Sequence, residues 1–126
     1  MEFDGLVRVA ARGVAALRVG LGVSALVSPG LAARPWVGET AGQPAGTVLG
    51  RAAGARDIAL GAGVLLAARQ GVRAERTWLV AGAFCDAVDA TTTAAHWRRL
   101  PPGGRFLVAG AAVGAAVVGA LAARVR

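Results

Sequence analysis

The most constraining feature of this chain is an unbroken apolar run over residues 106–123, which holds no charged or strongly polar side chain. A run of eighteen such residues meets the length that a helix needs to cross a membrane. Hydrophobic residues make up 56% of the chain, above the roughly 45–50% of ordinary soluble domains. The sequence therefore predicts an integral membrane protein. A soluble all-helical domain is the alternative, because the run is rich in alanine and glycine and charges break the other three apolar segments.

Four helical segments can be drawn along one domain of residues 1–126, and they predict an all-α fold, a four-helix transmembrane bundle. The segments cover about residues 9–28, 47–68, 77–97 and 104–124. The first connection contains three prolines and several glycines, so we expect irregular or interfacial structure there. The second connection is short and basic, and the third is a tight turn. The even number of segments places both termini on the same side.

The third segment is flanked by two tryptophans, the residue type that favours membrane borders. Trp78 and Trp97 are nineteen residues apart. That separation spans ~29 Å along a helix, which is the thickness of the hydrocarbon core. Asp86 and Asp89 straddle the midpoint between them. Both carboxylates are therefore predicted to lie near the middle of the membrane.

The first two segments place charges at the same depth. Counting ~15 Å back from the helix-breaking end of the first segment reaches Arg18, and the same count in the second segment ends beside Arg56 and Asp57. A charge at mid-membrane costs ~3 kcal/mol on insertion scales, so such residues usually face a helix bundle and pair with one another. The sequence therefore predicts a site at this level.

Small residues share the helix faces of these charges. Arg18 shares its face with Ala11, Ala15, Gly22 and Ala25. Asp57 shares its face with Gly50, Gly54 and Gly61. Arg56 points ~100° away from Asp57, so it either borders the cluster or turns toward a neighbouring subunit. Rows of small residues let helices approach closely in lipid, so we expect both faces to point inward and to bring Arg18 near Asp57 and the third segment. The glycines of the last segment are expected to close the bundle or to pair two copies as a homodimer.

A polar stripe runs along the third segment at helical spacing, formed by Gly82, Asp86, Asp89, Thr93 and His96. It is interpreted as an entry path for a proton or a substrate, in which Thr93 and His96 contact the ligand. In the alternative interpretation the threonine hydroxyls bond back to carbonyls four residues earlier, and His96 is an ordinary polar residue at the membrane border.

The charge balance of the predicted site is uneven, since two arginines face three aspartates. Two carboxylates three residues apart repel each other at low dielectric, so we expect Asp86 or Asp89 to hold its proton. A protonated acid suits a proton carrier or a general acid. The alternative is a structural lock, in which the arginines neutralise the aspartates and fix the order of the helices.

The remaining charges argue for a membrane and against nucleic acid. All basic residues are arginine, which we read as the mark of a GC-rich bacterial genome, and they gather at segment ends as anchors rather than in one stripe. Their excess on one side favours cytoplasmic termini. No cleavable signal peptide is expected. The single D-x-x-D pair, Asp86 and Asp89, has arginines beside it, so we predict no metal and no cofactor.

Three stretches carry a family resemblance: ALRVGLG at 16–22, GRAAGARDIALGAG at 50–63 and AGAFCDAVDA at 81–90. They resemble the motifs of a family of small four-helix bacterial integral membrane proteins, common in actinobacteria, whose function is uncharacterised. The resemblance implies the fold and a signature at Arg18, Gly54, Arg56, Asp57, Asp86 and Asp89, but no activity. The architecture is also remotely similar to the DoxX-like four-helix membrane proteins.

Three functions follow as hypotheses. The first is a multi-pass protein of the cell membrane that binds a hydrophobic small molecule or a partner protein, with ligand-binding candidates Arg18, Arg56, Thr93 and His96. The second is an intramembrane isomerase or cyclase of an isoprenoid or lipid, with Asp86 or Asp89 as general acid and Asp57 as base or orienting group. The third is a proton-coupled exporter that works as an oligomer.

Overall fold

The computed structural model describes residues 2–125, and every regular element in that range is a helix, as predicted. The α-helices are α1 (Glu2–Val27), α2 (Pro29–Val37), α3 (Pro44–Ala67), α4 (Val72–Ala95) and α5 (Pro102–Arg124). Two short 3-10 helices, η1 (Gly38–Gly42) and η2 (Trp97–Arg99), lie between them. The four long helices match the four predicted segments. They begin earlier than expected at Glu2 and Val72, because the arginines and glutamates before the apolar stretches are themselves good helix formers.

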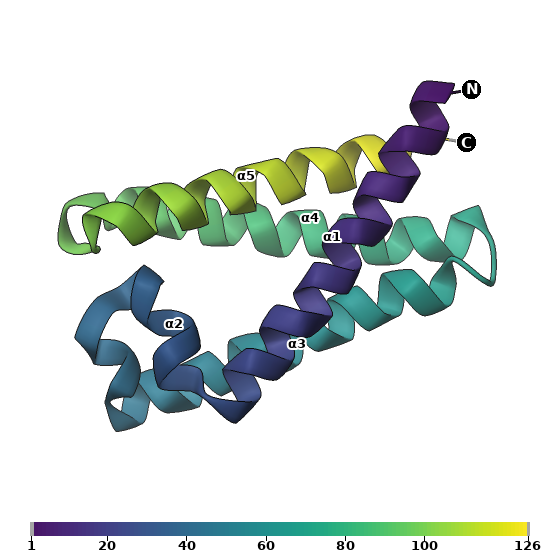
Figure 1. Cartoon of the computed structure of the whole chain (residues 1–126). Coiled ribbons are helices and arrows are strands. Elements are labelled where there is room, and N and C mark those ends of the chain that lie inside the picture. Colours follow the sequence, from purple (N-terminus) through teal and green to yellow (C-terminus); the bar gives the residue numbers. More distant parts are fainter. Residues whose placement is uncertain (1, 126) are drawn as a thin grey trace.

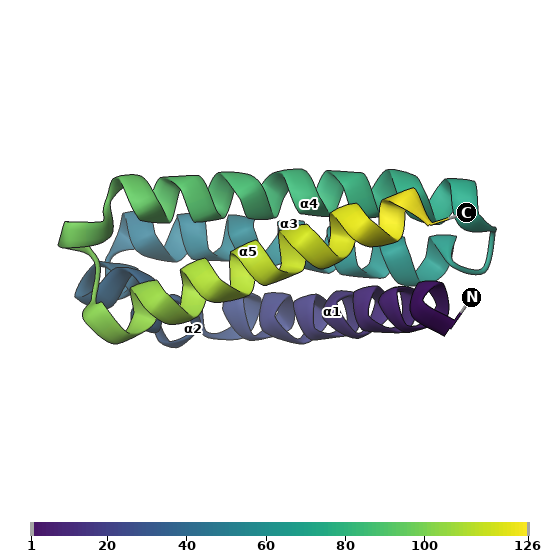
Figure 2. The ribbon, with the colours of Figure 1, turned by 90° about the horizontal axis from the view of Figure 1, so that it is seen from above.

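The four long helices lie side by side, with α2 and the two 3-10 helices at one end and the chain termini together at the other (Figure 1). Helix α1 packs chiefly on α3, α4 packs chiefly on α5, and α3 joins the two pairs by packing on α4 (Figures 1 and 2). Helix α2 packs on α3 and also reaches α5. The apolar core, which includes Val7, Val64, Leu79 and Ala122, lies at the end with the termini. From there α1 and α5 diverge toward α2 (Figure 1).

Close approach between α1 and α3 depends on glycine. A Cβ atom on Gly54 would lie 2.8 Å from the carbonyl oxygen of Gly22, a distance that real Cβ atoms do not show. The small-residue faces of α1 and α3 therefore point toward each other, as predicted. Helix α5 packs on α4 through Gly119, whereas Gly110 and Gly114 have no neighbour within 4 Å in the described chain. Gly110 and Gly114 therefore do not close the bundle, and the alternative that they pair two copies stays a prediction.

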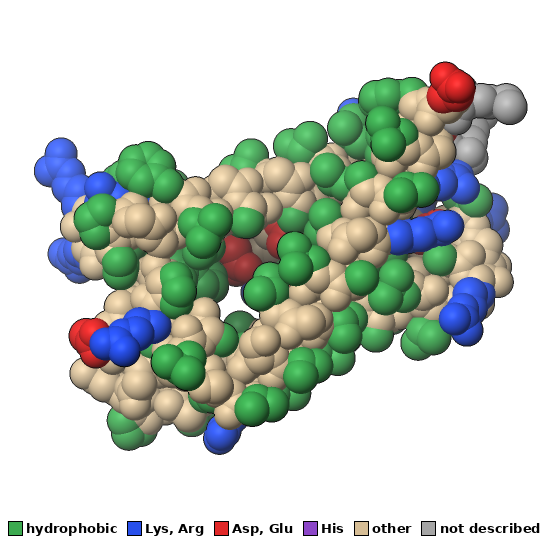
Figure 3. Space-filling model, in the orientation of Figure 1, with side chains coloured by type: hydrophobic (Ala, Val, Ile, Leu, Met, Phe, Trp, Pro, Cys, Tyr) green, Lys and Arg blue, Asp and Glu red, His purple; other side chains and the backbone are tan. Residues whose placement is uncertain are grey.

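Apolar side chains lie over much of the face shown in Figure 3. Many large apolar residues are exposed, whereas most buried residues are small and a few are charged. More than half of the surface of each of the following is exposed: Phe3, Leu6, Leu17, Leu31, Phe84 and Leu107. The buried set consists mainly of alanines and glycines and includes Glu75, Asp86 and Thr93. A domain that folds in water has the opposite distribution, with its large apolar residues inside and its carboxylates outside.

By length and composition, α1 and α5 are able to cross a membrane, and most of each helix is exposed rather than buried. Helices α3 and α4 do not reach the same apolarity, because Arg56 and Asp57 interrupt α3 and Asp86 and Asp89 interrupt α4. Two helices of suitable length and apolarity are therefore found, and a crossing by all four long helices stays a prediction.

The connection between α1 and α3 is largely helical, which corrects the expectation of irregular structure. Pro29 and Pro44 each occupy the first position of a helix, where the missing N–H would have no helical partner and the fixed φ is favourable. Pro35 lies inside α2, and the helix ends soon after it at Gly38, whose φ is 72°. The prolines therefore begin and end short helices instead of preventing them.

Candidate charge-chain site

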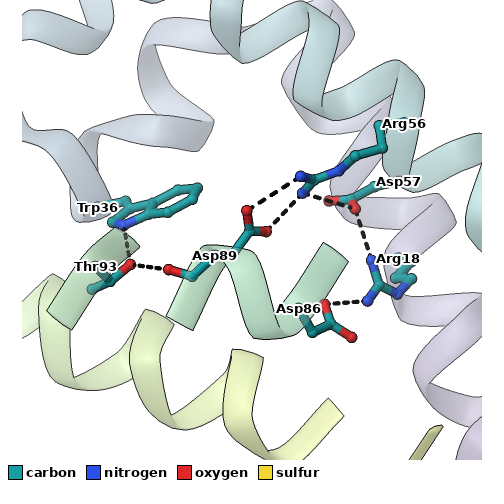
Figure 4. Close-up of polar contacts among 7 residues, drawn as sticks. All are labelled: Arg18, Trp36, Arg56, Asp57, Asp86, Asp89 and Thr93. Carbon is teal, nitrogen blue, oxygen red and sulfur yellow. Dashed lines mark hydrogen bonds and ion pairs between the residues drawn. The ribbon is translucent and has the colours of Figure 1, made fainter. Parts of the chain in front are cut away.

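Five charged side chains from α1, α3 and α4 form a continuous series of opposite charges, which we call the charge chain: Asp86, Arg18, Asp57, Arg56 and Asp89 (Figure 4). The Nη1 atom of Arg18 donates to Oδ1 of Asp57 at 2.8 Å, and its Nη2 atom forms an ion pair with Asp86. The Nη2 atom of Arg56 lies 3.5 Å from Oδ1 of Asp57. The two oxygens of Asp89 accept from Arg56 at 3.2 and 2.7 Å.

The charge chain is not equally buried along its length. The side chains of Arg18 and Asp86 are 12% and 9% exposed, whereas that of Arg56 is 34% exposed. Each charge has an opposite charge beside it, which offsets the free-energy cost of removing it from water. With all five groups ionised, three carboxylates face two guanidinium groups, and the charge chain carries one net negative charge. The deep end at Asp86 is therefore the more desolvated part of an anionic site.

Small residues allow Arg18 to reach both of its partners. A Cβ atom on Gly61 of α3 would lie 3.2 Å from the Cβ atom of Arg18, so α1 and α3 meet closely beside the arginine. A Cβ atom on Gly82 of α4 would lie 3.9 Å from Nη2 of Arg18. The guanidinium therefore passes over Gly82 on its way to Asp86. The faces of small residues that the sequence predicted therefore let Arg18 lie between Asp57 and Asp86.

Several polar atoms of the charge chain have no protein partner. Asp57 and Asp86 each meet a guanidinium group through Oδ1, and within residues 2–125 neither Oδ2 atom accepts a hydrogen bond. The Nε atom of Arg56 is buried and lacks an acceptor in the same part of the chain. Of the three aspartates, only Asp89 has both oxygens engaged (Figure 4). The carboxylates of Asp57 and Asp86 can therefore each accept a further hydrogen bond.

A small cavity borders the deep end of the charge chain. It has a volume of about 20 Å³ and lies between Arg18 and Asp86 on one side and Ala115, Val118 and Gly119 of α5 on the other. A space of this size holds about one water molecule. Figure 3 shows acidic side chains at the bottom of a hollow bounded by α1, α2 and α5. The carboxylates are therefore visible from outside the protein between these helices.

The polar stripe of α4 continues beyond the charge chain in both directions. Toward the termini, both oxygens of Glu75 accept from Arg12 of α1, at 2.8 and 3.1 Å, and the carboxylate side chain is only 4% exposed. Toward α2, the indole Nε1 atom of Trp36 donates to the hydroxyl of Thr93 at 3.1 Å (Figure 4). Each polar side chain on the buried face of α4 therefore meets a donor from another helix.

Sequence reasoning placed Arg18 with the three aspartates and left open whether Arg56 borders them or turns toward a neighbouring subunit. It missed Arg12, Glu75 and Trp36. The signal for Glu75 was present, because stepping back from Gly82 by three and then four residues leads through Leu79 to Glu75 on the same face of α4. Trp36 carried no such signal, since it lies on the connection predicted to be irregular.

The predicted ligand-binding residues do not all join the charge chain. Thr93 lies one turn beyond Asp89 and donates to its carbonyl oxygen at 2.7 Å. His96 is exposed at the end of α4, with Nδ1 2.9 Å from the carbonyl oxygen of Thr92. The catalytic roles of Asp57, Asp86 and Asp89, and the ligand-binding roles of the other candidates, stay predictions.

A second concavity lies at the α2 end of α4. This groove has a volume of about 220 Å³ and is lined by Trp36, Val37, Thr92, Thr93, His96 and Leu100. No group of three or more His, Cys, Asp or Glu side chains in residues 2–125 is arranged to hold a metal ion.

No protein-family model, curated protein or solved structure matches this chain. The family resemblance inferred from its motifs therefore stays a prediction, and the functional argument depends on the geometry alone.

Proposed function

We propose that this chain is a multi-pass protein of the cell membrane in which all four long helices cross the bilayer as a four-helix transmembrane bundle. The inverted distribution of side chains supports this proposal, since large apolar residues cover the outside and paired charges lie within. The charges that make α3 and α4 less apolar take part in the charge chain. Lipid would therefore meet mainly aliphatic and aromatic side chains.

Within this bundle the charge chain acts as the binding centre for a hydrophobic small molecule that carries a small cationic group. The observation that carries the proposal is that Oδ2 of Asp57 and Oδ2 of Asp86 accept no hydrogen bond within residues 2–125, in a charge chain with one excess negative charge. An ammonium group supplies both the missing charge and the missing hydrogen-bond donors. The hollow between α1, α2 and α5 supplies a lateral route to these carboxylates (Figure 3).

The size of the inner cavity weighs against a bulky ligand beside Asp86. A volume of about 20 Å³ accommodates a water or an ammonium group, but not an isoprenoid chain. The geometry thus favours a ligand whose apolar part stays at the lipid-facing opening. It offers no comparable support for the isomerase or exporter hypotheses.

Binding is tested with decylammonium and decanol, which share an apolar chain and differ in the charge of a small head group. In detergent micelles, decylammonium is expected to raise the melting temperature of the purified protein, with at least about tenfold tighter binding than decanol. Asp57→Asn should abolish this preference. Glu75→Gln, which removes a carboxylate charge from the same interior but outside the charge chain, should retain it.

Two results would overturn the binding proposal. One is equal binding of the alcohol and the amine by the unaltered protein. The other is an unchanged preference in a folded Asp57→Asn protein. If Asp57→Asn does not fold, Asp57→Glu keeps the charge and tests the same site, because displacement of the carboxylate should weaken amine binding while helix content by circular dichroism stays the same.

The membrane placement has its own test in cells. In a Cys85→Ala background, single cysteines at Arg73 and Arg99 should react with a membrane-impermeant maleimide from opposite sides of the membrane. A cysteine at Leu17 should react only after the membrane is dissolved. Recovery of the protein in the soluble fraction, or labelling of all three positions from one side, would contradict a four-helix crossing.

A further inference from the structure

The groove between α2 and the end of α4 presents carbon atoms, although half of its lining residues are polar. The hydroxyl of Thr93 is occupied, since it donates to the carbonyl oxygen of Asp89 at 2.7 Å and accepts from the indole of Trp36 at 3.1 Å. The Nδ1 atom of His96 lies 2.9 Å from the carbonyl oxygen of Thr92. The hydrogen bond to Thr93 holds the indole of Trp36 in place as one wall of an apolar groove of about 220 Å³. Its shape and chemistry suit a hydrocarbon chain.

The residues next to the groove carry uncompensated positive charge. Arg98 and Arg99 belong to η2, between the lining residues His96 and Leu100, and both are exposed. In the part of the chain that the structure describes, neither forms an ion pair. Glu39 of η1, an acidic residue at this end of the protein, pairs with Arg34. An apolar groove whose lining residues flank two exposed arginines without an ion pair in residues 2–125 fits a molecule that has both an acyl chain and an anionic head group.

Arg105 adds a third cation at this end. Its Nη1 atom donates to the carbonyl oxygen of Trp97 at 2.7 Å, and its guanidinium lies over the rings of Trp97 and Phe106, at 5.0 and 5.6 Å from their centroids. It has no carboxylate partner within residues 2–125. These contacts tie η2 to α5 and hold the base of the segment that carries Arg98 and Arg99. The positive charge of this end is therefore built on a supported backbone.

We propose that this end of the protein binds one anionic phospholipid, with an acyl chain in the groove beside Trp36 and the phosphate on Arg98 and Arg99. The site rests on the membrane placement proposed above but not on ligand binding at the charge chain. Guanidinium groups form short, charge-assisted hydrogen bonds with phosphate, and each basic residue near a membrane surface strengthens binding to anionic lipid. A zwitterionic phospholipid would fill the groove equally well but would leave the positive charge uncompensated.

The test uses the fluorescence of Trp36. A Trp78→Phe, Trp97→Phe protein keeps Trp36 as its only indole and is reconstituted in bilayers of phosphatidylcholine with brominated acyl chains, which quench a tryptophan that they contact. Replacing a small fraction of this lipid with unbrominated phosphatidylglycerol should restore fluorescence more than the same fraction of unbrominated phosphatidylcholine does. We expect a preference of about tenfold for phosphatidylglycerol.

Paired variants separate this site from general surface charge. Arg98→Gln with Arg99→Gln should reduce the preference to near unity. Arg73→Gln with Arg76→Gln, which removes two exposed arginines of the opposite end that form no ion pair within residues 2–125, should leave it unchanged. Thr92→Phe, which fills the groove without changing charge, should weaken the protection of Trp36 by phosphatidylglycerol.

Each remaining result overturns the proposal. Equal recovery of Trp36 fluorescence with the two lipids would show that the groove does not select anionic lipid. An equal loss of the phosphatidylglycerol preference in the two double-arginine variants would show that the lipid is attracted by the charge of the whole surface. A protein with Trp78 as its only indole reports separately on the membrane placement. If brominated lipid quenches neither indole, the membrane placement fails and this site fails with it. If Trp78 alone is quenched, only the lipid site fails.

Discussion

Arg56 and Asp89 face each other across the contact between α3 and α4, and the guanidinium donates to both carboxylate oxygens, at 3.2 and 2.7 Å. Two parallel hydrogen bonds of this kind require the flat, forked donor geometry of arginine. The pair therefore fixes the rotation of α3 against α4 as well as their separation. It also closes the outer end of the charge chain.

Replacing Arg56 should measure how much this forked pair contributes to stability. Arg56→Met leaves Asp89 without its partner and should lower the free energy of unfolding by about 2 kcal/mol, below the usual loss for a fully buried pair because the arginine side chain is 34% exposed. Arg56→Lys keeps the charge but loses the fork, so about half that loss is expected. Unfolding in mixed micelles with increasing dodecyl sulfate provides the measurement. A lysine variant as stable as the unaltered protein would show that charge alone matters here.

The contact between α1 and α3 should be sensitive to a single methyl group. Gly54→Ala brings a Cβ atom to 2.8 Å from the carbonyl oxygen of Gly22, and overpacking against backbone should cost about 1–3 kcal/mol. Gly20→Ala in α1 is the matched control, because no neighbour lies within 4 Å of its Cβ position. The control should gain up to about 1 kcal/mol from the higher helix propensity of alanine. Melting temperatures of the two variants should therefore move in opposite directions, and similar shifts would argue against this close packing.

Glu75 and Arg12 should act as a structural pair independent of the charge chain. Glu75→Gln keeps the shape but removes the charge that receives two guanidinium hydrogen bonds, so a loss of about 1–2 kcal/mol in unfolding free energy is expected. Adding Arg12→Gln should cost little more, because its partner is already neutral. A double-mutant cycle on the melting transition checks this, and fully additive losses would mean that the pair contributes no coupling.

The bond between Trp36 and Thr93 should hold α2 against α4. Thr93 is 1% exposed, and Thr93→Val removes the hydroxyl that accepts from Trp36 while nearly preserving the side-chain volume. Helix α2 should therefore detach from α4 more often, while the long helices stay intact. Hydrogen exchange of the peptide 29–43 should become several-fold faster. Thr91→Val, at an exposed position whose hydroxyl bonds only to the carbonyl of Ala87, is the control and should leave this peptide unchanged. Equal acceleration in both variants would contradict an anchoring role.

The charged core could be predicted because its residues are spaced at helical intervals. Arg18, Asp57 and Asp86 stand among glycines and alanines, and burying them without partners is so costly that their pairing follows once helices are assumed. The sequence indicated that Arg18 lies near Asp57, but which aspartate Arg56 meets could not be predicted. That choice depends on rotations of a few tens of degrees between helices, and these are set by contacts such as Gly54 on Gly22.

The connection from Pro29 to Pro44 could not be predicted as a helix, because a proline that begins a helix and one that breaks it look alike in a single sequence. The same uncertainty hid Trp36. Its role depends on α2 folding back along α4, a tertiary contact that no local pattern encodes. The error at this one connection therefore concealed both the hydrogen bond to Thr93 and the groove beside it.

The pairing of Arg56 with Asp89 has a consequence for biosynthesis in the proposed membrane. Neither α3 nor α4 partitions readily into lipid while its ionised side chains are bare, yet the turn between them is short and their opposite charges meet directly. The two helices would leave the translocation machinery together, as a preassembled hairpin. Ribosomes that pause or release the chain after α3 would thus yield a fragment that cannot integrate, and quality-control proteases would be expected to remove it.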